Sequence, residues 1–321
     1  MATNQIIISH LNPQEFSPKY PTVFPQYGSK DLGDYLFHQR IQRWQEKIYY
    51  KQKVQTSDTF FYQFESNFSP IQIDLFNVLY DDPQVTIVLN QVGVNPQIPG
   101  LYIYQGAIQF AGLPEGCYYT ELSPGTDPAD KEVSEPIELK VTSDEPTIYH
   151  EFKHSHFHGD VIFETGIQFA FRVEASRGKL YPVSDDTFYR DQKLSPYQTS
   201  SKPYESYDLK YGGSAGIPDW VVRKVNWIWS CDTVMLNGKS FAKDPGTNNS
   251  SQGIQINEED DYPLYGLSML ITPGINRASK IINPSVDPNK RLMAVLITDG
   301  TLFGDLSVNV GDNLIPFQSI E

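Results

Sequence analysis

Short segments in which apolar and polar residues alternate recur along the chain, and they limit it to a strand-rich fold. Residues 71–75 read Ile-Gln-Ile-Asp-Leu, and residues 134–141 and 167–173 repeat the same period of two. This period places the apolar side chains on one face of a strand. Glycine and proline turn signals between such segments are typical of β-sandwiches. The sequence therefore predicts a mainly β protein with two sandwich-like domains.

The first predicted domain spans residues 58–146 and forms a β-sandwich. Its strand candidates combine aromatic or β-branched residues with nearby turn residues. They are residues 60–65, 71–75, 85–89, 113–122 and 134–141.

The second predicted domain spans residues 147–321 and is β-rich with long loops. Its strand candidates are residues 147–153, 160–164, 167–174, 267–272, 292–298 and 306–310. Asn237-Gly238 suits a type I′ turn and predicts a hairpin. Pro218, followed by apolar residues on one side through Ile228, predicts the one short helix of this domain. Residues 175–205 and 244–261 are polar and are interpreted as loops.

Residues 1–57 are expected to form an extended arm and docking segment. Four prolines between Pro13 and Pro25 fix φ and remove N–H donors, so a packed element is disfavoured. The apolar residues of this arm are costly to leave in water. We therefore expect the arm to lie across a neighbouring subunit, with disorder as the alternative.

A locally basic stretch follows at residues 36–55. Ile41, Trp44 and Ile48 have the spacing of a short helix. Cations interleaved with aromatic residues describe an amphipathic docking segment, and nucleic-acid contact is the alternative. The candidate interface residues of the arm and this stretch are Ile7, Phe16, Tyr20, Phe24, Trp44, Tyr49 and Tyr50.

Composition narrows the functional classes. The 321 residues include 25 Lys and Arg against 39 Asp and Glu, a net charge of −14 that disfavours general binding to nucleic acid. Aromatic residues make up 13%, more buriable surface than a disordered chain carries. No apolar run reaches the length of about 18 residues that a membrane-spanning helix needs. The N-terminus lacks a signal peptide, so synthesis in a cytoplasm is expected, with Cys117 and Cys231 as buried free thiols.

Four of the six histidines fall within the nine residues 150–158. In a strand, His154, His156 and His158 share one face, which makes them candidate zinc ligands. A solvent-facing strand end and a pH-responsive interface are the alternatives. Phosphate-binding loops, nucleophile elbows and paired-cysteine zinc motifs are missing from the sequence. We therefore expect neither an enzyme nor a cofactor.

Three stretches of the chain resemble structural proteins of tailed bacteriophages and prophages of Bacteroidetes, including crAss-like phages. The first runs from Tyr49 to Thr59 and leads to Gln63–Asn67. The second pairs Leu113–Tyr119 with Ser134–Ile137. The third is Gly216–Trp220, continued by Cys231–Phe241. Together they cover roughly residues 44–245 and consist of strand and turn patterns.

The resemblance implies a non-enzymatic subunit of an oligomeric ring in the phage tail or portal–tail connector, found in the virion after assembly in the host cytoplasm. Twelve-fold symmetry is implied for a portal-proximal ring, and six-fold symmetry is possible further down the tail. Other tail or portal proteins are the expected partners, with no membrane and at most non-specific contact with passing DNA.

Two other functions compete with this interpretation. A host-recognition or glycan-binding module would use Trp220, Trp227, Trp229 and the tyrosines of residues 181–211 as stacking platforms. These tryptophans are otherwise core or interface residues. A metal-dependent enzyme would use the histidine cluster.

Overall fold

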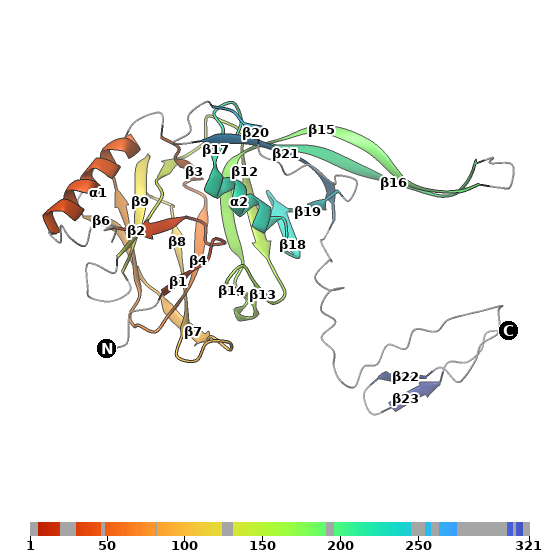
Figure 1. Ribbon diagram of the computed structural model, residues 1–321, viewed down its shortest axis with the longest axis horizontal. Helices are drawn as coiled ribbons and strands as arrows, with labels where there is room; N and C mark the ends of the chain where they lie inside the picture. The colour runs from red at the N-terminus through yellow and green to blue at the C-terminus, as the bar shows by residue number, and fades with distance from the viewer. Residues whose placement is uncertain are drawn as a thin grey trace. The chain divides into compact units, whose positions relative to one another are not determined.

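The computed structural model describes residues 6–19, 30–45, 49–80, 82–123, 131–190, 196–244, 254–257, 263–274, 307–310 and 313–316. The chain divides into two units, Met1–Asn276 and Arg277–Glu321. In the second unit, the described residues form one hairpin of β22 (Ser307–Val310) and β23 (Asn313–Pro316), at the predicted strand 306–310. The predicted strand 292–298 lies outside the described residues. Strands dominate the chain, so the predicted mainly β class is confirmed (Figure 1).

Two sheets in the first part of unit one form a β-sandwich. Their strands are β1 (Ile6–Ile8), β2 (Phe16–Pro18), β3 (Gln52–Gln55), β4 (Thr59–Ser66), β5 (Gln72–Asn77), β6 (Pro83–Val88), β7 (Asn90–Val94), β8 (Tyr102–Gln109), β9 (Gly116–Ser123), β10 (Glu132–Ser134) and β11 (Ile137–Lys140). One sheet has the order β1-β4-β8-β7. The other runs β2-β10-β9-β11-β3, with β5 joining β9 to β6.

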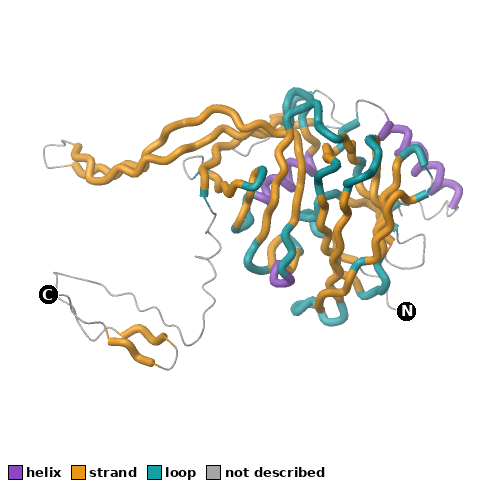
Figure 2. Tube along the Cα trace, turned by 180° about the vertical axis from the view of Figure 1, so that it is seen from behind, coloured by secondary structure: helices purple, strands orange, loops and turns teal. Residues whose placement is uncertain are grey.

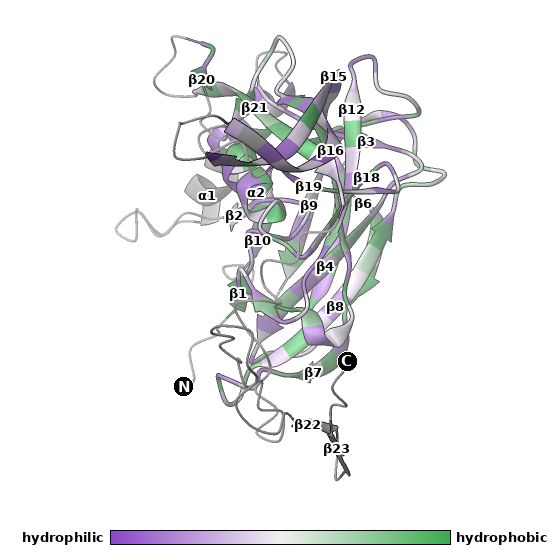
Figure 3. Ribbon diagram, turned by 90° about the vertical axis from the view of Figure 1, so that its right-hand side faces the viewer, coloured by the Kyte–Doolittle hydropathy of each residue, from purple (hydrophilic) through white to green (hydrophobic). Residues whose placement is uncertain are grey.

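The inner faces of these two sheets share one apolar core. Tyr62 and Phe64 of β4 pack in the same buried cluster as Ile73 of β5 and Leu122 of β9. Hydrophobic and hydrophilic residues alternate in bands along strands such as β4 and β8 (Figure 3). The period of two in the sequence thus separates an inner from an outer face. Strands β7 and β8 were not among the sequence predictions.

Helix α1 (Lys30–Gln45) covers the outer face of the second sheet. Phe37 and Trp44 lie two turns apart on one side of the helix and pack with Tyr119 of β9 and Val133 of β10. Their rings meet mostly edge to face, a favourable arrangement for aromatic pairs. The predicted short helix is therefore present but begins earlier than expected. The described residues contain two α-helices, this one and the helix that follows Pro218.

The remaining strands belong mainly to one further sheet. They are β12 (Thr147–Lys153), β13 (Phe157–His158), β14 (Val161–Ile162), β15 (Phe169–Arg190), β16 (Pro196–Tyr211), β17 (Ile217–Pro218), β18 (Thr233–Leu236), β19 (Lys239–Lys243), β20 (Ile254–Gln255) and β21 (Leu264–Pro273). The order β15-β12-β18-β19-β21-β16 closes into an antiparallel barrel, because β16 pairs with both β21 and β15. Closure removes the exposed edges that an open sheet would present.

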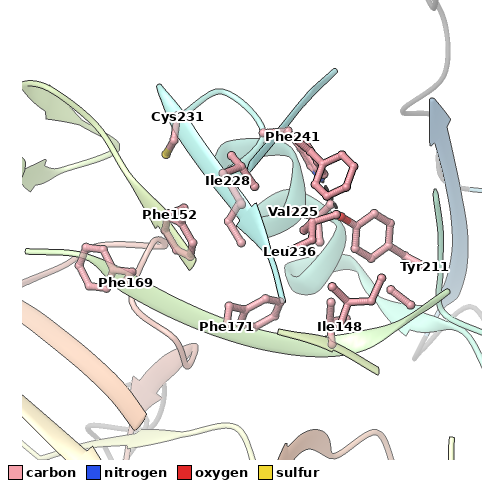
Figure 4. Close-up of a cluster of buried hydrophobic side chains, with 14 of the residues drawn as sticks. Ile148, Phe152, Phe169, Phe171, Tyr211, Val225, Ile228, Cys231, Leu236 and Phe241 are labelled. Carbon is pink, nitrogen blue, oxygen red and sulfur yellow. Dashed lines mark hydrogen bonds between the residues drawn. The ribbon is translucent and has the colours of Figure 1, made fainter. Parts of the chain in front are cut away.

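Helix α2 (Asp219–Ile228) fills the barrel's core from one side. Val221, Val225 and Ile228 are fully buried, and Val225 and Ile228 point toward Leu236 and Phe171 of the strands (Figure 4). The predicted helix is confirmed. The predicted hairpin is confirmed too: Asn237 and Gly238 both have positive φ, as a type I′ turn requires.

Residues 175–205 were interpreted from sequence as a loop, but the described parts of this range, residues 175–190 and 196–205, form strands. Beyond Ala175 and before Tyr207, β15 and β16 pair only with each other in a long two-stranded ribbon, which we call the projecting hairpin. It extends away from the barrel (Figures 1 and 2). The prediction was wrong because both faces of this ribbon meet solvent, so no apolar alternation marks its strands.

The predicted extended arm is also corrected, for the residues that the structure describes. β1 pairs with β4 and β2 pairs with β10, so residues 6–18 complete the sheets of their own chain. Among the described residues of this arm, Ile6, Ile8 and Phe16 pack against the sandwich core of their own chain. Prolines are compatible with this placement because both segments are short edge strands.

A buried polar seam joins sandwich and barrel. Asn12 makes paired hydrogen bonds with the backbone of Gln63, while the neighbouring Leu11 is buried in the barrel's core. Arg172 of β15 forms a two-point ion pair with Asp58, its Nε and Nη2 lying 2.6 and 2.7 Å from the carboxylate oxygens. Both side chains are almost fully buried. Removing one partner of such a buried ion pair strongly destabilises the protein, because the other charge is left buried and uncompensated.

We predict that Arg172→Leu lowers the free energy of unfolding by roughly 3–5 kcal/mol, because Asp58 is left as an uncompensated buried charge. Denaturant unfolding measures the change. The matched control is Arg223→Leu, which breaks the exposed ion pair with Asp219 and should cost less than about 1 kcal/mol. Equal losses in the two variants would contradict the prediction.

Candidate functional site

Two of the interface residues predicted near the N-terminus, Phe16 and Trp44, pack within their own chain. Phe16 meets the rings of Tyr62 and Phe64 at centroid distances of 6.5 and 5.7 Å. Ile7 is half-buried in β1, and Trp44 of α1 is fully buried against Tyr119 and Val133. Phe16 and Trp44 therefore pack in the hydrophobic clusters of this chain, and their apolar character reflects that role. Tyr20 and Phe24 lie outside the described residues.

Tyr49 and Tyr50 are likewise held by internal hydrogen bonds. The Tyr49 hydroxyl donates to Glu135 at 2.7 Å, and the Tyr50 hydroxyl donates to Glu174 at 2.9 Å. Burial raises the pKa of the Glu174 carboxyl to about 7. Tyr50 thus links the segment after α1 to strand β15, which is a structural role.

The histidine cluster is dispersed by the fold. His150 points into the barrel, where its Nε2 lies 2.9 Å from the Tyr211 hydroxyl. His156 is exposed and lies 3.5 Å from Glu164. His154 and His158 stack on each other, with ring centroids 4.6 Å apart. Within the described parts of the chain, no three His, Cys, Asp or Glu side chains are grouped to hold a metal ion.

The surroundings of the stacked pair do not resemble a hydrolytic triad. The Ser230 hydroxyl lies 2.8 Å from His158 Nε2 but donates its proton to the carbonyl of Trp227. It can therefore only accept from His158, whereas a nucleophilic serine must donate to its base. Asp232 contacts the other ring, His154, at 3.5 Å. Burial lowers the pKa of both rings.

The three tryptophans proposed as stacking platforms do not share a surface. Trp229 is buried and donates to Tyr211. Trp220 packs edge to face against Tyr50, with Lys224 over its ring. Trp227 alone of the three is exposed, at 43%. Of these three tryptophans, one side chain is therefore open to a ligand, whereas glycan stacking was expected to use several together.

The projecting hairpin carries a group of exposed apolar side chains. Strand β15 is buried from Phe169 through Ala175 and then turns solvent-exposed through Arg190. Phe188 and Tyr189, near its end, are 58% and 60% exposed, and Leu180 and Tyr181 near its base are about as open. Sequence reasoning noted the tyrosines here but assigned them to a loop. Their consecutive positions place one aromatic side chain on each face of the ribbon.

The edges of the projecting hairpin are protected against strand addition. Pro182 and Pro203 lie within its two strands and have no N–H group to offer a further strand. Lys179, Asp185 and Lys202 add exposed charges. Edge strands carrying proline and charge resist edge-to-edge pairing. We therefore expect this hairpin to contact a partner through the side chains on its two faces.

A groove of about 600 Å³ lies at the seam between sandwich and barrel. Phe61, Val92 and Gln105 line it from the sandwich sheet. Glu151 of β12 and Gln168 line it from the barrel, with the Gln168 amide donating to the Glu151 carboxylate at 3.1 Å. The groove thus combines apolar side chains, amides and one carboxylate. It is distinct from the stacked histidines.

Comparisons with known proteins add no relative: no family model, curated protein or solved structure matches this chain. Across the described residues, no helix has the length and apolar character needed to cross a membrane.

We predict that His150 makes the protein acid-sensitive. Burial lowers its pKa from 6.5 to about 4. Between pH 6.5 and pH 4, the His150 side chain is protonated in the unfolded chain and neutral in the folded chain. Stability from this group is complete above pH 6.5 and falls as the pH drops, by roughly 3 kcal/mol at pH 4. Denaturant unfolding across pH 4–7 should give a flatter profile for His150→Gln. The exposed His156→Gln is the control, and an unchanged profile for His150→Gln would refute the assignment.

Proposed function

We propose that this protein is a non-enzymatic structural protein of a phage virion, a subunit of an oligomeric ring in the tail or portal–tail connector. The observation that carries the proposal is the projecting hairpin. Its aromatic side chains extend beyond the core that would otherwise bury them. The resemblance of residues 44–245 to structural proteins of Bacteroidetes phages is the second support. In this proposal the projecting hairpin takes the intersubunit role first assigned to the N-terminal arm.

The energetics of the hairpin favour an assembly role. A two-stranded ribbon without a packed face is marginally stable in water. Four apolar side chains of the hairpin remain exposed to solvent: Leu180, Tyr181, Phe188 and Tyr189. Fully burying one large apolar side chain stabilises a protein by roughly 1.5–3 kcal/mol. Contact with a neighbouring subunit would recover part of that energy. Tyrosine and phenylalanine are also enriched at the centres of protein interfaces.

Charge supports a place along a DNA conduit. The chain carries a net charge of −14, so a wall built from its subunits would repel phosphates and let DNA pass without gripping it. Tail or portal proteins are then the partners, with at most non-specific contact with DNA. Ring symmetry, twelve-fold or six-fold, follows from the position in the tail.

A hairpin deletion tests the proposal. Replacing Pro182–Glu205 by Asn-Gly joins the paired residues Tyr181 and Ser206 through a two-residue turn and keeps the pairing of β16 with β21. We expect the full chain to form closed rings in mass photometry and negative-stain images, and the shortened chain to remain monomeric. Thermal unfolding should show that the core is retained, with its midpoint within a few degrees of the full chain.

Rings of unchanged size in the shortened chain would show that the hairpin has no part in assembly. A full chain that stays monomeric at high concentration, and also fails to join tail or portal proteins from lysed virions, would overturn the structural role itself.

A further inference from the structure

The groove and the tip of the projecting hairpin are complementary in character. The groove presents the apolar side chains of Phe61 and Val92 beside the carboxylate of Glu151. The tip presents Phe188 and Tyr189, followed at once by the cation Arg190. An aromatic side chain next to a guanidinium suits an apolar groove rimmed by a carboxylate and amides, because arginine pairs well with both.

The groove cannot receive the tip of its own chain. Ile167–Ala170 line the groove and lead directly into the barrel strand from which the hairpin extends. The 16 residues from Ala175 to Arg190 continue as one strand. At ~3.3 Å per residue they carry the tip about 50 Å from the base. An incoming tip must therefore belong to a second copy of this chain.

We propose, building on the function proposed above, that the tip of each hairpin seats in the groove of the next subunit. One aromatic side chain, Phe188 or Tyr189, packs against Phe61 and Val92, and Arg190 pairs with Glu151. Tip and groove are different surfaces, so the contact is heterologous and propagates from copy to copy until the ring closes. The prolines and charges along its edges keep the hairpin from pairing as an added strand, so its side chains make the contact.

Charge reversal tests the pairing directly. Arg190→Glu and Glu151→Arg should each weaken assembly by about ten-fold or more, since close charge pairs at interfaces couple by at least that factor. The double variant should recover most of the loss because it restores opposite charges. The matched control is Lys239→Glu, an exposed cation at the β18–β19 turn, which should assemble as the unaltered chain does. Assembly is followed by mass photometry over a concentration series.

Cross-linking tests the location independently of affinity. In a Cys117→Ser background, Phe188→Cys combined with Gln105→Cys should give a ladder of disulfide-linked oligomers on a non-reducing gel. Each single cysteine variant should give no ladder, and a mixture of the two should stop at linked pairs. Cys231 is buried and can remain.

The outcomes separate this inference from the proposed function. Rings that form in the unaltered chain, with no ladder and no rescue in the double charge variant, overturn the tip-in-groove contact and leave ring assembly standing. Absence of any assembly in the unaltered chain overturns both.

Discussion

The shared burial of strand β15 is the constraint on which the rest of the molecule depends. Phe169, Phe171 and Val173 point into the barrel's core, while Arg172 and Glu174 on the opposite face meet Asp58 and Tyr50 of the segment leading into the sandwich. One strand thus packs into the barrel's core on one face and makes polar contacts toward the sandwich on the other. Its polar face is tolerated in the interior because each charge has a partner there. Losing the Arg172–Asp58 ion pair would therefore destabilise the contact between sandwich and barrel.

This double anchoring also fixes the direction of the projecting hairpin. The same β15 backbone continues from the buried seam into solvent, and β16 is held at its base by pairing with β21 from Tyr207 to Tyr211. A hairpin clamped on both strands loses little further freedom when it binds. Pre-organisation of this kind lowers the entropic cost of association. The aromatic tip is therefore presented by a supported ribbon and not by a loose loop.

Local patterns predicted much of the fold and little of the site. Alternation and aromatic content located the sandwich strands β4, β5, β6, β9 and β11. Asn237-Gly238 and the apolar side of α2 were informative because one short segment determines each structure. The burial of Trp44 and Phe16 could not be inferred, since an apolar residue in a proline-rich segment looks the same whether its partner is its own chain or another. The hairpin was missed because a ribbon solvated on both faces carries no alternation. The groove joins residues from distant strands, and no local signal marks it.

The position of the groove has a mechanical consequence for a ring of such subunits. Phe169 and Ala170 line the groove and also begin β15, the strand that carries the outgoing hairpin. In the proposed ring, an incoming tip presses on the root of the next hairpin. Each contact then stiffens the element that makes the following contact. Binding that orders a site used by a second binding event gives positive cooperativity, so a ring built this way favours closure over partial arcs.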